Sequence, residues 1–399
     1  MIPGNGQRAT GIRLAAVIVT VACCPMPDAR AQLPPQRIDS RPAPWLFRLI
    51  PYPTYDNVEG LAGHVNVGVI KRSNEAPPPV SLAMGIEATA STAGTVGINA
   101  RYDAPGWWAG TRLLVWAGAE RLRRAPYFGL GNNSTTSDSL EDRFYRYELT
   151  RIGGGITLQQ RLAGPLRLHV AAQWRRYQAR SLDDSTAFAR DVRAGLVSDT
   201  VSAHAAELRA GVLFDTRDEE ASPSRGVFLE AMAVSGTGDV RYTRWLAGAR
   251  AFVPLGEFEQ WVVAVRQTLE LSEGNVPVFV QYERLTTWYP EDGFGGPTSL
   301  RLYAPGRFVA ENRGIASIDI RKKLLDFPLR TGPMRAWGLM FADAGRLWDQ
   351  DASPSLRGLH WAGGIGGRLQ FGKGTIFGLD LGLNGDDGFG FAFGTSFAF

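Results

Sequence analysis

Residues 388–399, at the end of the sequence, alternate between phenylalanine and small residues. Successive side chains of a β-strand point to opposite faces, so a strand here would place the aromatic rings on one face and glycine, alanine and serine on the other. The small face is unsuited to the core of a soluble sandwich, but it suits the lumen of a transmembrane β-barrel. An edge strand of a soluble sheet is the alternative, although so long an exposed aromatic edge would promote aggregation.

Length and composition agree with a barrel without selecting it. The 399 residues suffice for two soluble domains, or for one barrel of about sixteen strands at roughly 10 residues each. The 47 glycines and the 11% of aromatic residues, in short alternating runs, favour β structure. The formal net charge of +4 is too small to indicate a nucleic-acid partner.

Residues 1–31 are predicted to be a secretory signal peptide. Arg8 and Arg13 precede an apolar run at residues 14–23, and Ala29-Arg30-Ala31 has the small-residue pattern of a cleavage site. The run is too short to span a bilayer as a helix. The sequence therefore predicts export of the chain.

The two cysteines, Cys23 and Cys24, both fall inside this segment. The exported chain would then have no thiol or disulfide chemistry. Lipidation at Cys23 is an alternative interpretation of the same segment. Residues 32–45 are Pro-rich and predict a short tether, so we expect a barrel over residues 46–399 with no periplasmic domain ahead of it.

Turn signals separate sixteen candidate strands, an even number as bacterial barrels require. They are residues 45–55, 61–71, 80–90, 95–102, 110–122, 145–162, 166–177, 206–215, 226–234, 241–253, 260–272, 315–321, 335–348, 360–371, 375–383 and 388–399. Residues 166–177 alternate clearly between apolar and polar side chains, which fits a barrel wall and a soluble sandwich equally. Gly153-Gly154-Gly155 is predicted to form a β-bulge.

The longest segment between strands is residues 273–312, which is rich in glycine, proline and aromatic residues. A loop of this length is either disordered or functional, and its aromatic side chains indicate that it packs against something. Counting strands from a periplasmic C-terminus puts this loop at the extracellular end. The same count puts the turns at residues 215–226 and 326–333 at the periplasmic end.

Four short motifs follow one another in the second half of the sequence. They are Asp215-Thr216-Arg217-Asp218 with Pro223 and Gly226, Gly295-Gly296 with Leu300-Arg301-Leu302-Tyr303, Ser317-Ile318-Asp319-Ile320-Arg321, and Phe341-Ala342-Asp343-Ala344-Gly345. Together they resemble the barrel motifs of the BamA/TamA-type outer-membrane proteins, also called the bacterial surface antigen family. The resemblance covers roughly residues 46–399. Leu302 stands where the family has glycine, and Asp319 stands where it usually has glutamate.

The resemblance implies an all-β transmembrane antiparallel barrel of about sixteen strands, with an extracellular loop, residues 273–312, folded in or over the lumen. It implies that Arg301 pairs with Asp343, with Asp319 as a second acceptor. A guanidinium fork suits this pairing, whereas a solvated loop arginine would contribute almost nothing. The pair Phe397 and Phe399 resembles the C-terminal signature of bacterial outer-membrane barrels.

The function that the resemblance implies is translocation or insertion of proteins, or of lipid, at the outer membrane. Its partners would be outer-membrane lipid, a polypeptide substrate and a periplasmic partner protein, since related proteins carry soluble repeat domains ahead of the barrel. In that class the first and last strands form a weak seam. The alternatives are a passive or gated channel and a surface antigen without a transport role. In a channel, lumen charges would set ion preference; the candidates are Arg167, Arg175, Arg209, Glu207, Glu230 and Arg266.

No metal, cofactor or catalytic site is predicted. The histidines His64, His169, His204 and His360 are scattered, without metal-ligand spacing. Residues 367–374 nearly spell a phosphate loop but lack its Ser or Thr and join two strands. Ser272 and His360 are too far apart in strand order to form a hydrolase site, so we expect no enzyme.

Overall fold

The computed structural model describes residues 45–56, 60–72, 80–137, 139–197, 202–256, 260–289, 291–329, 332–352, 355–372 and 375–399. The predicted signal peptide, including Cys23, and residues 32–44 of the predicted tether lie outside the described residues. Within the described residues, no helix is long and apolar enough to cross a membrane.

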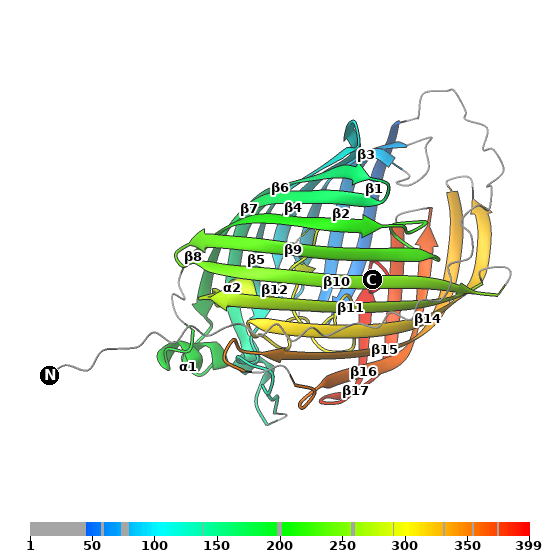
Figure 1. The fold of residues 1–399 in the computed structure, drawn as a ribbon. Helices are drawn as coiled ribbons and strands as arrows, with labels where there is room; N and C mark the ends of the chain where they lie inside the picture. The colour runs from blue at the N-terminus through cyan, green and yellow to red at the C-terminus, as the bar shows by residue number, and fades with distance from the viewer. Residues whose placement is uncertain are drawn as a thin grey trace. The chain divides into compact units, whose positions relative to one another are not determined.

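Sixteen antiparallel strands form one sheet in which each strand pairs with its neighbours in sequence. They are β1 (Trp45–Asp56), β2 (Gly60–Arg72), β3 (Val80–Ser91), β4 (Val96–Trp108), β5 (Thr111–Pro126), β6 (Arg146–Ala163), β7 (Leu166–Ser181), β8 (Ala203–Asp215), β9 (Gly226–Gly238), β10 (Tyr242–Leu255), β11 (Trp261–Gly274), β14 (Asn312–Leu329), β15 (Gly332–Trp348), β16 (His360–Phe371), β17 (Thr375–Asn384) and β18 (Gly388–Gly394). The sheet curls until β1 and β18 touch, which nearly closes a barrel (Figure 1). The predicted all-β barrel of about sixteen strands is confirmed.

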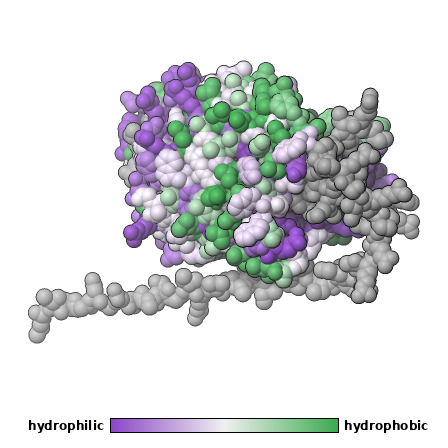
Figure 2. Space-filling model, turned by 90° about the horizontal axis from the view of Figure 1, so that it is seen from above, coloured by the Kyte–Doolittle hydropathy of each residue, from purple (hydrophilic) through white to green (hydrophobic). Residues whose placement is uncertain are grey.

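The strand β7 shows how the sequence pattern produces a barrel. Its outward side chains Val170 and Trp174 are 46% and 45% exposed, whereas the inward His169 and Arg175 are buried. A soluble sandwich would bury the apolar side chains and expose the polar ones, so the structure excludes that alternative. Figure 2, which views the barrel from the top of Figure 1, shows hydrophilic residues gathered at its left end and hydrophobic residues further along.

The two ends of the barrel differ in their connections. One end, which we call the long-loop end, carries the connections 127–145, 182–202, 275–311 and 349–359, with η1 (Asp142–Tyr145) and α1 (Ala187–Arg193). The other, the short-turn end, carries connections that are mostly shorter, among them the β8–β9 connection at residues 216–225 and the connection between β14 and β15. The strand count therefore correctly placed residues 273–312 and these two turns at opposite ends.

Residues 275–311, the in-folded loop, enter the lumen from the long-loop end. The loop contains α2 (Val278–Gln281) and a small antiparallel ladder between β12 (Glu283–Arg284) and β13 (Glu291–Asp292). Phe294, Leu300 and Phe308 are at most 1% exposed, and they join the inward side chains of β15 in one core cluster. The core of this barrel is therefore the packed interface between the loop and the inner wall.

The glycines at positions 153–155 do not form the predicted bulge. They pair in continuous register with both β5 and β7. A methyl group at Gly153 would lie 2.7 Å from the Arg175 side chain, and one at Gly155 would lie 2.6 Å from Trp116 Nε1. The glycines instead leave space for these two large inward side chains, which stack at 4.8 Å.

The last strand is shorter than predicted, and this expectation was wrong. β18 ends at Gly394, and the 395–399 segment turns into the lumen. Phe397 and Phe399, expected to face lipid, are 4% and 9% exposed and lie in the core cluster. The physical reason is the set of inward arginines, which offer hydrogen bonds to main-chain carbonyls and cationic groups to aromatic rings.

Cysteine labelling distinguishes the inward segment from a straight strand. We expect Phe389→Cys, whose position is 69% exposed, to react with a membrane-soluble maleimide. Phe397→Cys should be protected, because its position is enclosed by the lumen. A chain that starts at Gln32 has no other cysteine, so the label reports these positions alone. Unfolded protein serves as the control in which both react, and equal labelling of the two folded variants would contradict the inward turn.

Candidate functional site: the loop lock and the seam

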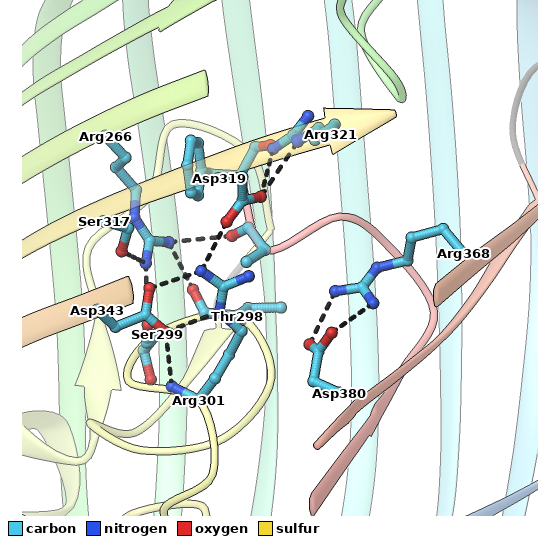
Figure 3. A network of polar contacts seen from close by, with 12 residues as sticks. Arg266, Thr298, Ser299, Arg301, Ser317, Asp319, Arg321, Asp343, Arg368 and Asp380 are labelled. Atoms are coloured by element: carbon cyan, nitrogen blue, oxygen red, sulfur yellow. Dashed lines mark hydrogen bonds and ion pairs between the residues drawn. The ribbon is translucent and has the colours of Figure 1, made fainter. Parts of the chain in front are cut away.

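Arg301 of the in-folded loop is bound by two carboxylates of the barrel wall, an arrangement we call the loop lock (Figure 3). Its Nε donates to Asp343 Oδ2 and its Nη2 to Asp343 Oδ1, both at 2.7 Å. Nη2 also donates to Asp319 Oδ1 at 2.7 Å. The Arg301 main-chain N–H donates to Asp343 Oδ2 at 3.1 Å. The implied pairing of Arg301 with Asp343, and with Asp319 as second acceptor, is thus present in the geometry.

The strands place the two carboxylates together. Asp319 lies on β14 and Asp343 on β15, with Asp319 opposite Phe341 and Asp343 opposite Ser317 in the register. Both aspartates share the inward face of this pair, so they converge on one point in the lumen. The guanidinium of Arg301 also lies 3.9 Å from the centre of the Phe341 ring. The Phe-x-Asp-x-Gly motif therefore supplies both a carboxylate and an aromatic face to the loop.

The lock is fully shielded from water. The side chains of Arg301, Asp319 and Asp343 are 0% exposed. Burial alone lowers the pKa of Arg301, but the carboxylates of Asp319 and Asp343 more than offset it and raise this pKa above its usual value. Removing one partner from such a buried pair costs about 3–5 kcal/mol, because the remaining charge stays buried without compensation.

A second group of arginines surrounds the lock and was not recognised as part of it from the sequence. Arg321 donates to Asp319 Oδ2 at 2.9 Å and to the Phe399 carbonyl at 3.1 Å. Arg266 donates to the carbonyls of Thr298 and Ser299 in the loop, at 2.7 and 2.9 Å.

The same network holds the 395–399 segment. Arg266 also donates to the Ala398 carbonyl at 3.0 Å, and Arg368 donates to the Ser396 carbonyl at 3.1 Å while pairing with Asp380. The loop and the 395–399 segment therefore share Arg266 as an anchor. The alternation of polar and apolar residues in the sequence indicates that these strand arginines point inward. It does not identify their hydrogen-bond partners, because those partners are distant in the sequence.

The glycines of the motifs serve close approach and turns. Gly295 and Gly296 have φ values of 117° and 89°, which a β-carbon disfavours. Gly345 on β15 faces the loop, where a methyl group would overlap the Phe294 ring.

Leu302 is exceptional among the described residues: it is the one non-glycine residue with a positive φ, 68°. This is the position where the resembling family has glycine. The conformation costs an L-residue about 1–2 kcal/mol. The backbone turn is therefore kept although the residue that suits it is absent, and Leu302 is held in place by its buried side chain.

Tyr303 ties the loop to the long-loop end of the wall. Its hydroxyl donates to Asp386 at 2.6 Å, and His360 Nδ1 lies 2.8 Å from the same carboxylate oxygen. His360 Nε2 lies 2.8 Å from the Asn132 carbonyl. Burial by itself raises the pKa of Asp386, but the hydrogen bonds from Tyr303 and His360 bring it below its usual value. His360 thus connects the wall with a second long loop.

Asp215 and Asp218 lie at the short-turn end and take no part in the lock. Asp215 accepts two hydrogen bonds from Arg217 at 2.9 Å each. Asp218 accepts from the main-chain N–H groups of Ser224 and Arg225 at 2.9 and 3.2 Å. These carboxylates organise the turn between β8 and β9.

The seam is the boundary between β1 and β18. The two strands touch, but they share no β-ladder among the described residues. Tyr55 and Phe391 stack across it at 5.8 Å, and Tyr52 meets Phe377 at 6.0 Å. A cavity of about 270 Å³ lies behind the seam, lined by β1, β2, β18 and the loop.

The wall formed by β4–β7 borders a polar part of the lumen. A cavity of about 240 Å³ there has the polar side chains Asn99, Arg101, Glu120 and Arg151 in its lining. Tyr289 of the loop covers it, with Arg101 at 4.8 Å from its ring. Burial and the nearby Asp103 carboxylate raise the pKa of the Tyr289 phenol to about 12. Among the described residues, no group of three or more His, Cys, Asp or Glu side chains is placed to hold a metal ion.

The fold and the lock define a class: a transmembrane β-barrel whose lumen holds its own in-folded loop. The Omp85 superfamily domain matches residues 82–399 of the sequence. The chain therefore belongs to the Omp85 superfamily, and the family and the fold indicate the outer membrane.

Solved structures of similar fold include BamA from Haemophilus ducreyi lacking POTRA domains 1–3, with a TM-score of 0.56 at 14% identity over 88% of this chain and 70% of that chain. CdiB from Acinetobacter baumannii gives 0.50 at 13% identity, covering 87% and 58%, and CdiB from Escherichia coli gives 0.51 at 10%, covering 90% and 67%. At these identities the likeness shows the fold alone. The chain spans 58–70% of the length of these proteins. Among curated protein sequences no relative matched.

Arg301→Ala tests the lock. We expect the in-folded loop to become sensitive to added protease and the ionic conductance of the barrel to change, because two buried carboxylates lose their shared partner at a cost of about 3–5 kcal/mol. Arg301→Lys, which keeps the charge but loses the fork, should give an intermediate result. Arg357→Ala, at an exposed loop position, is the matched control. Unchanged proteolysis and conductance in Arg301→Ala would rule the lock out.

Leu302 allows a test of backbone strain. Both Leu302→Gly and Leu302→Ala delete the buried side chain, but only glycine accepts the positive φ freely. Glycine relieves about 1–2 kcal/mol of backbone strain but loses about 0.5–1 kcal/mol more conformational entropy on folding than alanine. We therefore expect the glycine variant to unfold at a higher temperature than the alanine variant, measured by heat-modifiable gel mobility. A more stable alanine variant would mean that the loop turn relaxes when the side chain is lost.

Proposed function

We propose that this barrel inserts or translocates polypeptides at the outer membrane through the β1–β18 seam, with the long-loop end facing the outside of the cell. The observation that carries the proposal is the seam itself. β18 is the shortest barrel strand, at 7 residues, and has no β-ladder with β1 among the described residues. Separating β1 from β18 would break few main-chain hydrogen bonds, each of which contributes about 0.5–1.5 kcal/mol to stability.

The in-folded loop supports β18 from inside. A methyl group at Gly390 would lie 2.7 Å from the Leu302 carbonyl, so strand and loop are in close contact. Asn384 of β17 donates to the same carbonyl at 3.0 Å. Because Arg301 anchors this loop to β14 and β15, the lock fixes the position of one edge of the seam. The other edge, β1, is left available to pair with an incoming strand.

The proposed substrate is a polypeptide, and a periplasmic partner protein would present it to the barrel. No reaction chemistry is required, so the proposed role is not enzymatic. The alternative is a passive or gated channel, which the polar cavity along β4–β7 favours. The two roles differ in whether the seam must open.

A cross-link across the seam tests the proposal. Tyr55→Cys and Phe391→Cys, joined by a short bis-thiol reagent, should abolish barrel-stimulated insertion of an unfolded outer-membrane protein into proteoliposomes. The matched control joins Leu379→Cys and Phe393→Cys, which face each other in the β17–β18 ladder and leave the seam free. Bilayer currents are recorded on the same samples. Undiminished insertion by the cross-linked seam would refute the proposal, and a steady open conductance in both samples would support the channel.

A further inference from the structure

Three outward-facing arginines lie together on the wall at the long-loop end, away from the lock and the seam. They are Arg121 on β5 and Arg176 and Arg180 on β7, and each is exposed. We call them the arginine triangle. Outward orientation follows from register, because Arg176 and Arg180 alternate with the buried, inward Arg175, Tyr177 and Ala179.

The register fixes the dimensions of the triangle. In the strand register Arg121 is opposite Thr150 of β6, and Thr150 is opposite Gln178 of β7. Arg121 is therefore level with the residue midway between Arg176 and Arg180. Four residues along a strand span about 13 Å, and two strand spacings span about 10 Å. Thr150, Gln178 and Glu148, which is opposite Arg180 in the register, occupy the area between the three arginines and add polar groups to it.

The triangle carries a net positive charge that one carboxylate offsets only in part. Arg121 pairs with Glu148 at 2.7 Å. Arg176 and Arg180 have no carboxylate partner among the residues that the structure describes, so three guanidinium groups face one carboxylate. An exposed arginine surrounded by water needs no carboxylate partner. Arg176 and Arg180, however, lie next to an apolar part of the outer wall that faces lipid.

Directly beside the triangle the same outer surface becomes apolar. Ile152, Trp174 and Leu208, on β6, β7 and β8, are 48%, 45% and 68% exposed. Ile156 and Val170 continue this surface towards the short-turn end at 47% and 46%. Exposed apolar side chains on the outer wall of a barrel mark the depth of the hydrocarbon, so the triangle lies at the depth of the lipid headgroups.

We propose that the arginine triangle binds the headgroup of a glycolipid with two separated phosphates, whose acyl chains lie along the apolar surface below. Phosphate oxygens match the planar fork of arginine. The α-carbons of Arg176 and Arg180 are about 13 Å apart, so each arginine can hold its own phosphate at one end of a disaccharide, an arrangement that a glycerophospholipid with a single phosphate does not offer. The proposal relies on the orientation given under the proposed function, which puts this surface in the outer leaflet.

Lipid titration of the purified barrel in detergent tests this binding. The probes are diphosphoryl lipid A, monophosphoryl lipid A and phosphatidylglycerol, with binding followed by native mass spectrometry. We expect diphosphoryl lipid A to bind most tightly. Arg176→Gln/Arg180→Gln should weaken it at least ten-fold, since two charge-assisted contacts are lost. Arg357→Gln, which changes an exposed arginine in a loop at the same end of the barrel, should bind as the unaltered chain does.

Several results would overturn the inference: equal binding by the double variant, equal binding of the two forms of lipid A, or tighter binding of phosphatidylglycerol. Arg176→Lys/Arg180→Lys should retain part of the affinity, because charge remains without the fork. The titration uses no polypeptide substrate and is independent of orientation in the membrane. Its failure is therefore distinguishable from failure of the seam experiment, which leaves this surface unchanged.

Discussion

Buried guanidinium groups in the lumen impose the constraint on which the rest of this structure depends. In the region of the lock, four arginines, Arg266, Arg301, Arg321 and Arg368, face three aspartates, Asp319, Asp343 and Asp380. A buried cation without acceptors is very costly. The wall supplies the carboxylates, and carbonyls of the loop and of the 395–399 segment supply further acceptors. Loop, wall and final segment are thus joined by one polar network.

This network also explains why the seam differs from every other boundary in the sheet. Elsewhere neighbouring strands are held by main-chain ladders. β18 keeps such a ladder with β17, but it has none with β1 among the described residues, and the loop contacts it from inside at Gly390. Small residues on the inner face of β18 permit that contact. We propose that the position of the loop sets the strength of the seam, so that the buried ion pair of the loop lock affects the opening that the proposed function requires.

Arginines on the inner and outer surfaces of the barrel have different environments. Inside, arginines are buried and paired, as Arg175 and Arg301 are. Outside, Arg176 and Arg180 are exposed beside an apolar surface and lack carboxylate partners among the described residues. Arg175 and Arg176 are consecutive residues of β7, so their side chains point to opposite faces of the sheet. Arg175 therefore lies in the lumen, whereas Arg176 faces the lipid.

The sequence by itself determined the fold class, the number of strands and the end at which the long loop emerges. Period-two alternation and turn residues are local signals, and sixteen strands of this kind can satisfy their main-chain groups in lipid only as a closed barrel. The motifs around Arg301, Asp319 and Asp343 indicated the lock through their resemblance to a family. Spacing alone left Arg301 open to interpretation as a solvated loop residue.

Only the tertiary structure decided where residues 395–399 go. Phe397 and Phe399 continue the alternation of β18 and read as lipid-facing, but Arg266, Arg321 and Arg368, on three strands distant in sequence, offer partners that lipid lacks. The role of Gly153-Gly154-Gly155 was decided in the same way, by Trp116 and Arg175 on neighbouring strands. Alternation in the sequence specifies the face of the sheet on which a side chain lies. The residues that it contacts on that face come from distant parts of the chain, so only the folded barrel brings them together.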